Sequence, residues 1–229
     1  MTSGIDILYE DGDIIVCHKQ SGIPVQTPKS GQMDMVSLLK NYRAGRNEVP
    51  EIFLIHRLDQ PVEGVMVFAK AKGSADDLNR QLQRNRMDKY YWAVTDIHLE
   101  EPTGVRKDYL LKNGKTNTSS VVPSNTVGAK RAELSYRVVA QNEKQDLVEI
   151  CLETGRHHQI RVQMAHFGYP ILGDKKYNPN CKETYEPIAL CSVRLSFLHP
   201  KSKKKMEFHI NPKGEIFKGF EIKNSTKDI

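Results

Sequence analysis

Short apolar runs separated by turn residues dominate the hydrophobic pattern of this chain. The runs at 7–9 and 14–16 flank Asp11-Gly12-Asp13, which predicts two strands joined by a tight turn. Other runs rich in β-branched, aromatic or alternating apolar residues predict further strands. They lie at 52–55, 65–69, 89–97, 134–140, 147–152, 188–197 and 205–210.

Three segments instead repeat apolar residues at helical spacing, at 35–43, 74–86 and 157–167. Ser74 stands three residues before Asp77, which resembles a capping box and predicts that the second helix starts there. Gly168 predicts a left-handed end to the third helix. Polar residues fill 112–131, which predicts a hairpin or loop with little core. Strands outnumber helices without strict alternation, so we expect the α+β class.

Composition adds a basic charge to this picture. The 229 residues are 38% hydrophobic and 27% charged, with a net charge of +6 and a pI near 9.0. A basic excess favours a polyanionic partner, RNA or DNA, although basic proteins without such a partner share it. The four cysteines are scattered and form no zinc pattern, which favours a reducing compartment. No signal peptide or run of roughly 20 apolar residues is present, so we expect a cytoplasmic protein with no membrane partner.

Three polar motifs interrupt or border the apolar runs. The tetrad His56-Arg57-Leu58-Asp59 lies between two predicted strands, where charged groups are costly unless they face a cleft and a charged substrate. The others are Lys89-Tyr90-Tyr91-Trp92-Ala93-Val94 and Thr154-Gly155-Arg156-His157-His158-Gln159-Ile160-Arg161.

Together these motifs resemble the RluA-like pseudouridine synthases, enzymes that isomerise uridine within RNA. Weaker matches at 19–22, 129–136 and 190–200 extend the resemblance over most of the chain. It implies a single α+β domain, with a mixed and mostly antiparallel sheet, flanking helices and a central cleft. We expect this domain at 1–222 and a polar tail at 223–229. The pattern begins by Leu8, so we expect no additional N-terminal RNA-binding domain of the S4 type.

The resemblance implies three catalytic residues. Asp59 is the nucleophile, because a carboxylate can add covalently and then leave. Attack on the ribose, attack on the base and a glycal route all remain open. Tyr91 offers a ring to stack on uracil and a hydroxyl for proton transfer. Strand alternation predicts that Lys89, Tyr91 and Ala93 share one face, and we expect Tyr90 and Trp92 on the other face to lie in the core. Arg161 is the partner that keeps Asp59 ionised and orients it.

Further residues are expected to contact RNA. Arg57 either forms a structural salt bridge or, as the resemblance suggests, inserts into the RNA where the target base has left the stack. The other candidate substrate-binding residues are His56, Lys89, Arg156, His158, Gln159, Lys130 and Arg131. Of these, Arg156, His158 and Gln159 either hold their own loop or contact the RNA backbone. Additional phosphate contacts are expected from Arg80, Arg84, Arg86 and Lys203 to Lys205. No cofactor is implied, and no metal, since the histidine pair 157–158 lacks carboxylates or cysteines at ligand spacing.

The chain departs from the family pattern after the nucleophile. Most members have Thr-Ser-Gly two residues beyond the Asp, whereas this chain has Val62-Glu63-Gly64. Glu63 adds a negative charge that raises the pKa of Asp59 unless its side chain points away. A second departure is Cys191-Ser192, where many members have His-Ala. The change at Val62-Glu63 bears on fine tuning and substrate class more than on the reaction.

Two alternative functions use the same residues. A non-catalytic RNA-binding module that kept the fold predicts loss of Asp59, Tyr91 or Arg161, and all three are present. A hydrolase with Asp59 and Glu63 as an acid–base pair gives the Arg161 motif no role. The leading hypothesis is therefore a monomeric pseudouridine synthase acting on structured RNA, such as a tRNA stem-loop or a short rRNA hairpin.

Overall fold

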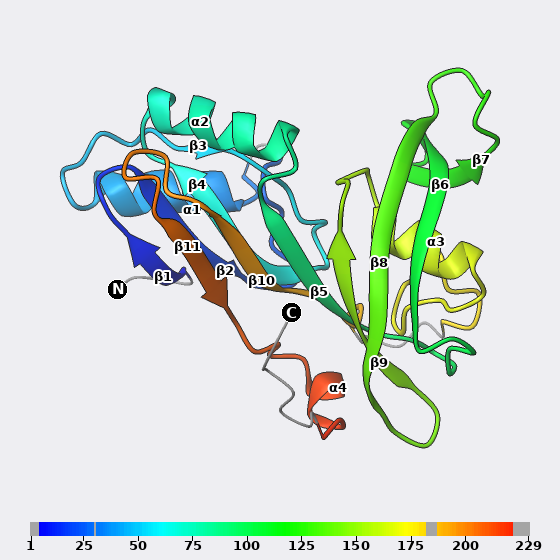
Figure 1. Ribbon diagram of the computed structural model, residues 1–229. Coiled ribbons are helices and arrows are strands. Elements are labelled where there is room, and N and C mark those ends of the chain that lie inside the picture. Colours follow the sequence, from blue (N-terminus) through cyan, green and yellow to red (C-terminus); the bar gives the residue numbers. More distant parts are fainter. Residues whose placement is uncertain (1–4, 30, 182–186, 222–229) are drawn as a thin grey trace. The chain divides into compact units, whose positions relative to one another are not determined.

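The computed structural model describes residues 5–29, 31–181 and 187–221. The chain divides into two compact units, each of which carries its own strands and helices (Figure 1). Unit 1 comprises Met1–Lys89 and Cys191–Pro212, and unit 2 comprises Tyr90–Leu190 and Lys213–Ile229. Among the described residues, no helix combines the length and apolar character needed to span a bilayer.

Unit 1 is built on six strands in the order β1-β2-β4-β10-β11, with β3 also paired to β4. Their bounds are β1 (Asp6–Glu10), β2 (Ile14–Lys19), β3 (Phe53–Leu54), β4 (Glu63–Ala69), β10 (Leu190–Leu198) and β11 (Lys205–His209). All pairs are antiparallel except β4 and β10, which run parallel. β4 is buried along its whole length, as expected for a central strand.

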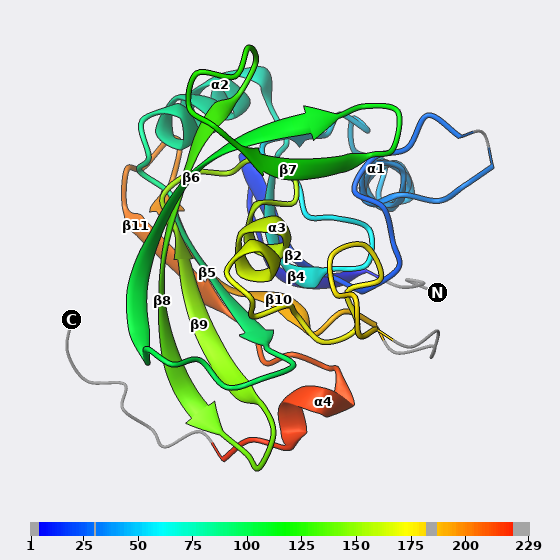
Figure 2. The ribbon, with the colours of Figure 1, turned by 90° about the vertical axis from the view of Figure 1, so that its right-hand side faces the viewer.

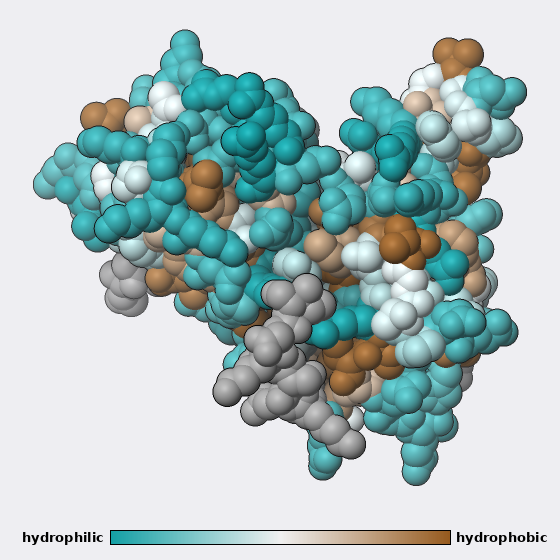
Figure 3. Space-filling view, viewed as in Figure 1, coloured by the Kyte–Doolittle hydropathy of each residue, from teal (hydrophilic) through white to brown (hydrophobic). Residues whose placement is uncertain are grey.

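Two helices accompany this sheet, α1 (Met35–Ala44) and α2 (Lys72–Gln83). Asp34 caps α1 by accepting a 2.7 Å hydrogen bond from the Ser37 amide. α2 packs against β3 and β4 (Figure 1) and presents a mostly hydrophilic outer surface (Figure 3). The predicted start of this helix at Ser74 was wrong: the cap position is Ala71, and the Ser74 hydroxyl bonds Asp13 instead of the helix backbone.

One core cluster of unit 1 lies between α2 and the sheet. Alternate residues of the central strands and the apolar stripe of α2 form one cluster. It contains Ile14, Val16, Ile55, Val65, Val67, Ala69, Ala75, Leu78, Met87, Leu195 and Phe197. The apolar runs on both sides of the His56–Asp59 tetrad therefore anchor that segment in a rigid sheet.

Gly64 is required where β4 meets β10. Its φ is +152°, and a Cβ there would lie 2.4 Å from the Ser192 Cβ. We expect Gly64→Ala to lower the free energy of unfolding by about 2–4 kcal/mol, through backbone strain and overpacking. Urea denaturation measures the loss. Gly73→Ala is the matched control, since that Cβ meets nothing within 4 Å and helix propensity predicts a gain of about 0.5–1 kcal/mol. Equal effects of the two changes would contradict the prediction.

Unit 2 is an antiparallel sheet in the order β5-β9-β8-β6-β7. The bounds are β5 (Asp88–Val94), β6 (Thr103–Asn113), β7 (Thr118–Val122), β8 (Lys130–Gln141) and β9 (Asp146–Leu152). The sequence did not predict β6, whose residues are mostly exposed and carry charges on the faces of the strand. The predicted hairpin within 112–131 is confirmed as the β6–β7 turn.

Helices α3 (Gln159–His166) and α4 (Glu215–Lys218) complete unit 2. α3 packs beside the β6–β7 hairpin (Figure 2), where Val162 joins Leu110 and Ala132 in a small core. Gly168 adopts φ +85° after this helix, which confirms the predicted left-handed end.

The α+β class and the mixed, mostly antiparallel sheet predicted from the sequence are confirmed. The central cleft and the domain bounds 1–222 and 223–229 stay predictions. The predicted tail lies outside the described residues.

Candidate active site

Asp59 lies in unit 1, in a turn between β3 and β4 that several hydrogen bonds hold in place. The side chain is half-buried, so it is neither sealed in the core nor fully exposed. The turn closes through a 3.0 Å hydrogen bond from the Val62 amide to the Asp59 carbonyl. The loop after β2 braces it, since the Gly22 amide donates to the Gln60 carbonyl at 2.9 Å and the Ser21 hydroxyl to the Pro61 carbonyl at 2.7 Å.

Lys19, at the end of β2, is the cation beside this turn, and its side chain is 0% exposed. Its Nζ donates to three carbonyls, those of Gln20 (3.0 Å), Ile23 (2.7 Å) and Gln60 (3.1 Å). Burial lowers the Lys19 pKa to about 8, against the raising influence of the Asp59 and Glu63 carboxylates. Lys19 thus provides positive charge near Asp59. Its hydrogen bond to the Gln60 carbonyl also holds the residue that follows Asp59. In the sequence, Lys19 belongs only to the weak family match at 19–22.

His56 and Arg57 point to different environments. His56 is buried, and its Nε2 accepts a 3.2 Å hydrogen bond from the Val67 amide, so it anchors the tetrad to β4. Arg57 is exposed, and its Nη2 donates to the Gln26 side chain at 3.2 Å. Arg57 is therefore not held by a buried salt bridge, whereas substrate contact by His56 or Arg57 stays a prediction.

His56 must stay neutral to make its bond. Burial, and to a smaller extent the Lys89 charge, lower the His56 pKa to about 3. The unfolded chain binds the proton at a higher pH, so the His56 contribution to stability is present above about pH 6.5 and is lost as pH falls toward 3. We expect His56→Gln, whose amide oxygen can accept from Val67, to show a weaker loss of unfolding free energy between pH 7 and pH 5. Urea denaturation measures this change. An equal loss of unfolding free energy in both proteins between pH 7 and pH 5 would contradict the prediction.

β5 carries Tyr91 on its buried face. Lys89, Tyr91 and Ala93 are buried in alternation, which confirms the predicted shared face. Tyr90 and Trp92 on the other face were expected in the core, and that was wrong: both are half-buried. Within the part of the chain that the structure describes, the buried Trp92 Nε1 has no hydrogen-bond partner. Lys89 belongs to unit 1 and Tyr91 to unit 2.

The Thr154–Arg161 motif of unit 2 folds around the buried Gln159 side chain. Its Oε1 accepts from the Thr154 hydroxyl (2.8 Å) and the Arg156 amide (2.9 Å), and its Nε2 donates to the Glu133 carbonyl (3.0 Å). Arg156 Nε donates to the Arg131 carbonyl at 2.8 Å. These bonds confirm that Gln159 and Arg156 hold the loop, and RNA contact by either stays a prediction.

His158 precedes α3 in a left-handed conformation, with φ 54°. Its ring stacks on His157 at 3.8 Å, and its Nδ1 lies 2.7 Å from the Tyr177 hydroxyl. That hydroxyl accepts from the Ser119 amide at 2.7 Å, so it can donate to Nδ1. The arrangement gives His158 a structural role beside any contact with RNA.

Arg161 is buried on α3 and forms a two-pronged ion pair with Asp174. Nε lies 2.9 Å from Oδ2 and Nη2 lies 2.7 Å from Oδ1. The guanidinium also stands over the Tyr177 ring, 5.3 Å from its centroid. Asp174 lies outside the Thr154–Arg161 motif, and the sequence did not reveal this role. Asp174 is 0% exposed, so this carboxylate orients the Arg161 guanidinium rigidly.

Lys130 and Arg131 open the exposed end of β8. Arg131 and Lys107 both pair with Glu133, Lys107 at 3.3 Å. Exposed pairs of this kind are weak, so these cations stay available to an anionic partner.

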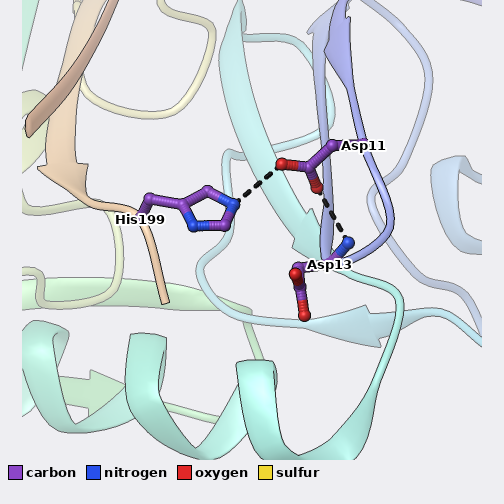
Figure 4. A group of neighbouring side chains, drawn as sticks. All are labelled: Asp11, Asp13 and His199. Carbon is purple, nitrogen blue, oxygen red and sulfur yellow. Dashed lines mark hydrogen bonds and ion pairs between the residues drawn. The ribbon is translucent and has the colours of Figure 1, made fainter. Parts of the chain in front are cut away.

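Among the described residues, one cluster has the donor types of a metal site: Asp11, Asp13 and His199 (Figure 4). His199 Nδ1 accepts from the amides of Lys201 (3.3 Å) and Ser202 (3.0 Å), so the proton is on Nε2, which donates to Asp11 Oδ2 at 2.8 Å. A protonated ring nitrogen has no lone pair for a metal. The cluster is a hydrogen-bond network that ties two turns of unit 1 together, and the metal-free expectation stays a prediction.

The predicted residues divide between the units. Unit 1 contains His56, Arg57, Asp59 and Lys89, and unit 2 contains Tyr91, Lys130, Arg131, Arg156, His158, Gln159 and Arg161. Pairing of Asp59 with Arg161 stays a prediction.

Three curated relatives give similar matches. The chain is 35% identical over 205 residues to an uncharacterized RNA pseudouridine synthase of Mycoplasma pneumoniae, covering 89% of this chain and 65% of the relative. It is 31% identical over 209 residues to ribosomal large subunit pseudouridine synthase C of Vibrio cholerae (89% and 64%). For the protein of that name from Buchnera aphidicola, the identity is 32% over 224 residues (94% and 69%). The chain thus spans about two thirds of the length of these relatives.

The fold matches a solved human structure, RNA pseudouridylate synthase domain containing 4, with a TM-score of 0.80. Sequence identity is 24%, and the match covers 96% of this chain and 95% of the human one. This likeness supports the fold. The family model described as RNA pseudouridylate synthase matches residues 13–166, which include the tetrad and the Arg161 motif. By this match and by the relatives, the chain belongs to the RNA pseudouridylate synthase family.

Proposed function

We propose that this chain isomerises uridine to pseudouridine in RNA, with Asp59 as the nucleophile. The observation that carries the proposal is the half-buried Asp59 on a braced turn next to the cation Lys19, in a chain of this family. A nucleophilic carboxylate needs access to substrate and benefits from a nearby positive charge, and these two features supply both.

The reaction is an isomerisation whose atoms balance without a cofactor. The bond from ribose C1′ to N1 of uracil breaks, the base turns, and a bond from C1′ to C5 forms. The hydrogen of C5 leaves and N1 gains one. Asp59 holds the fragment covalently or assists a glycal route, and Tyr91 stacks on the base and relays the proton. Arg161, oriented by Asp174, directs the Asp59 oxygens.

RNA binding rests on the exposed cations. Arg57 fills the space of the extruded base, and Lys130 and Arg131 hold phosphates. Further phosphate contacts come from the β10–β11 turn and from α2, although Lys203 and Arg80 also pair with Asp77. The substrate is a stem-loop of rRNA or tRNA. The names of the Vibrio and Buchnera relatives, ribosomal large subunit pseudouridine synthase C, favour large-subunit rRNA. A monomeric state and a cytoplasmic location stay predictions.

Purified protein tests the proposal directly. Total RNA from cells lacking the gene is incubated with the protein in the presence of a chelator and no added cofactor, and pseudouridines are mapped at nucleotide resolution. The proposal expects one or a few uridines to convert. RNA binding without any conversion would favour a non-catalytic module.

A further inference from the structure

Tyr177 contacts three separate segments of unit 2, and the proposed mechanism gives it no role. It lies in the loop after α3, is half-buried, and packs against the small core beside that helix. Its ring faces the Arg161 guanidinium, and its hydroxyl bonds both the Ser119 amide and His158. One side chain thus joins Arg161 to a strand of the sheet.

The ring of Tyr177 fixes the plane of the Arg161 guanidinium. The guanidinium carbon stands 5.3 Å from the ring centroid, within the range of a cation–π contact, and Arg161 is buried. Asp174 binds the edge of the same guanidinium through Nε and Nη2. A ring against the face opposes tilting that an edge contact alone permits. Asp174 and Tyr177 lie in one short turn, closed by a 2.9 Å hydrogen bond from the Asn178 amide to the Asp174 carbonyl.

The hydroxyl of Tyr177 holds this ring in place. It accepts from the Ser119 amide at 2.7 Å and donates to His158 Nδ1 at 2.7 Å, so its proton and a lone pair are both used. Ser119 belongs to β7, the edge strand of the unit 2 sheet, where an outward amide needs a partner outside the sheet. The position of the ring therefore depends on the strand to which the hydroxyl is bonded.

Further bonds attach the turn before β7 to both ends of α3. The Asn117 carbonyl accepts from Lys176 Nζ at 2.7 Å, after the helix, and Asn117 Oδ1 lies 3.1 Å from His157 Nε2, before it. The Ser119 hydroxyl donates to the His157 carbonyl at 3.0 Å. Asn117 and Lys176 are exposed, whereas Ser119 is buried, so the bond from Ser119 to Tyr177 is better shielded from water than the two bonds of Asn117.

We propose that Tyr177 is a positioning residue of the isomerisation: its ring sets the plane of the Arg161 guanidinium, and its hydroxyl fixes that ring to β7. The inference rests on the proposed function, because Arg161 acts there by directing the Asp59 oxygens. A tilted guanidinium misdirects the nucleophile but leaves the proposed phosphate contacts intact. The loss therefore falls on kcat and not on KM.

Two substitutions separate the ring from the hydroxyl. Tyr177→Phe keeps the ring and loses the hydroxyl, and Tyr177→Leu loses both. We expect kcat to fall about fivefold in Tyr177→Phe and about 100-fold in Tyr177→Leu, with KM within about threefold of wild type in both. The partial rescue by Phe distinguishes the role of the ring from a general loss of packing.

Tyr169→Phe is the matched control. It removes another half-buried tyrosine hydroxyl of unit 2 that accepts from a backbone amide, that of Glu100 at 3.4 Å. Its kcat should stay within about twofold of wild type. Thermal unfolding monitors the fold of each protein.

Amide hydrogen exchange tests the hydroxyl without reference to activity. The Ser119 amide loses its acceptor in Tyr177→Phe, so we expect it to exchange at least about tenfold faster than in wild type. Tyr169→Phe should leave the Ser119 rate unchanged.

The outcomes separate the two proposals. An inactive wild-type protein contradicts the proposed function. With an active wild-type protein, this inference alone is overturned if Tyr177→Phe and Tyr177→Leu lose kcat equally. It is also overturned if either kcat or the Ser119 exchange rate of Tyr177→Phe equals that of wild type, and these two measurements decide by themselves if Tyr177→Leu does not fold.

Discussion

Replacing Asp59 with Asn is expected to abolish pseudouridine formation, lowering kcat by about 10⁴-fold or more. The amide keeps the size of the side chain but can neither add covalently nor stabilise positive charge at C1′. The measurement is single-turnover conversion of a synthetic RNA that contains a mapped target uridine. RNA affinity should change little, because the proposed phosphate contacts involve other residues.

Asp76→Asn is the matched control for Asp59→Asn. It removes an exposed carboxylate of α2 in the same unit and should leave the rate within about twofold, as surface changes usually do. Conversion by Asp59→Asn at a rate close to wild type would exclude Asp59 as the nucleophile.

Asp174→Ala is expected to destabilise the protein by about 3–5 kcal/mol, because it leaves the Arg161 guanidinium buried without its carboxylate partner. Both side chains are buried, and the pair is joined by two hydrogen bonds. Urea denaturation, followed through a signal from unit 2 such as the fluorescence of Trp92, measures the loss.

Glu149→Ala provides the comparison for Asp174→Ala. It breaks the pair with Arg137 in the same unit, where Arg137 is 44% exposed. An exposed pair contributes about 0–1 kcal/mol. Equal losses for the two variants would mean that the Arg161–Asp174 pair is not a buried, rigid element of the site.

The sequence predicted the elements whose apolar pattern is regular. The β1–β2 hairpin, β4, β9 and the end of α3 at Gly168 agree with the structure because local turn chemistry and burial act together there. β6 was missed because its side chains are mostly exposed and carry no apolar alternation. The start of α2 was misplaced because Ser74 bonds a distant aspartate, a tertiary contact that no local pattern reveals.

The sequence motifs predicted the candidate site residues, and the contacts in the structure show which groups hold these residues in place. The motifs located Asp59, Tyr91 and Arg161, and their roles still await a test. The groups that support the motifs came only from the structure. The Lys19 bond to the Gln60 carbonyl joins residues 41 positions apart, and the Arg161 bond to Asp174 joins residues 13 positions apart. The two departures at Glu63 and Cys191 read as separate changes in sequence, and become one interaction across β4 and β10.

The central claim is that this chain converts uridine in RNA through the carboxylate of Asp59. Pseudouridine mapping of total RNA from gene-deleted cells, complemented with wild type or with Asp59→Asn, tests it most directly. The account predicts at least one uridine site that is lost on deletion, restored by wild type and not restored by Asp59→Asn at equal protein level. Restoration of that site by Asp59→Asn, or an RNA map unchanged by deletion, would contradict it.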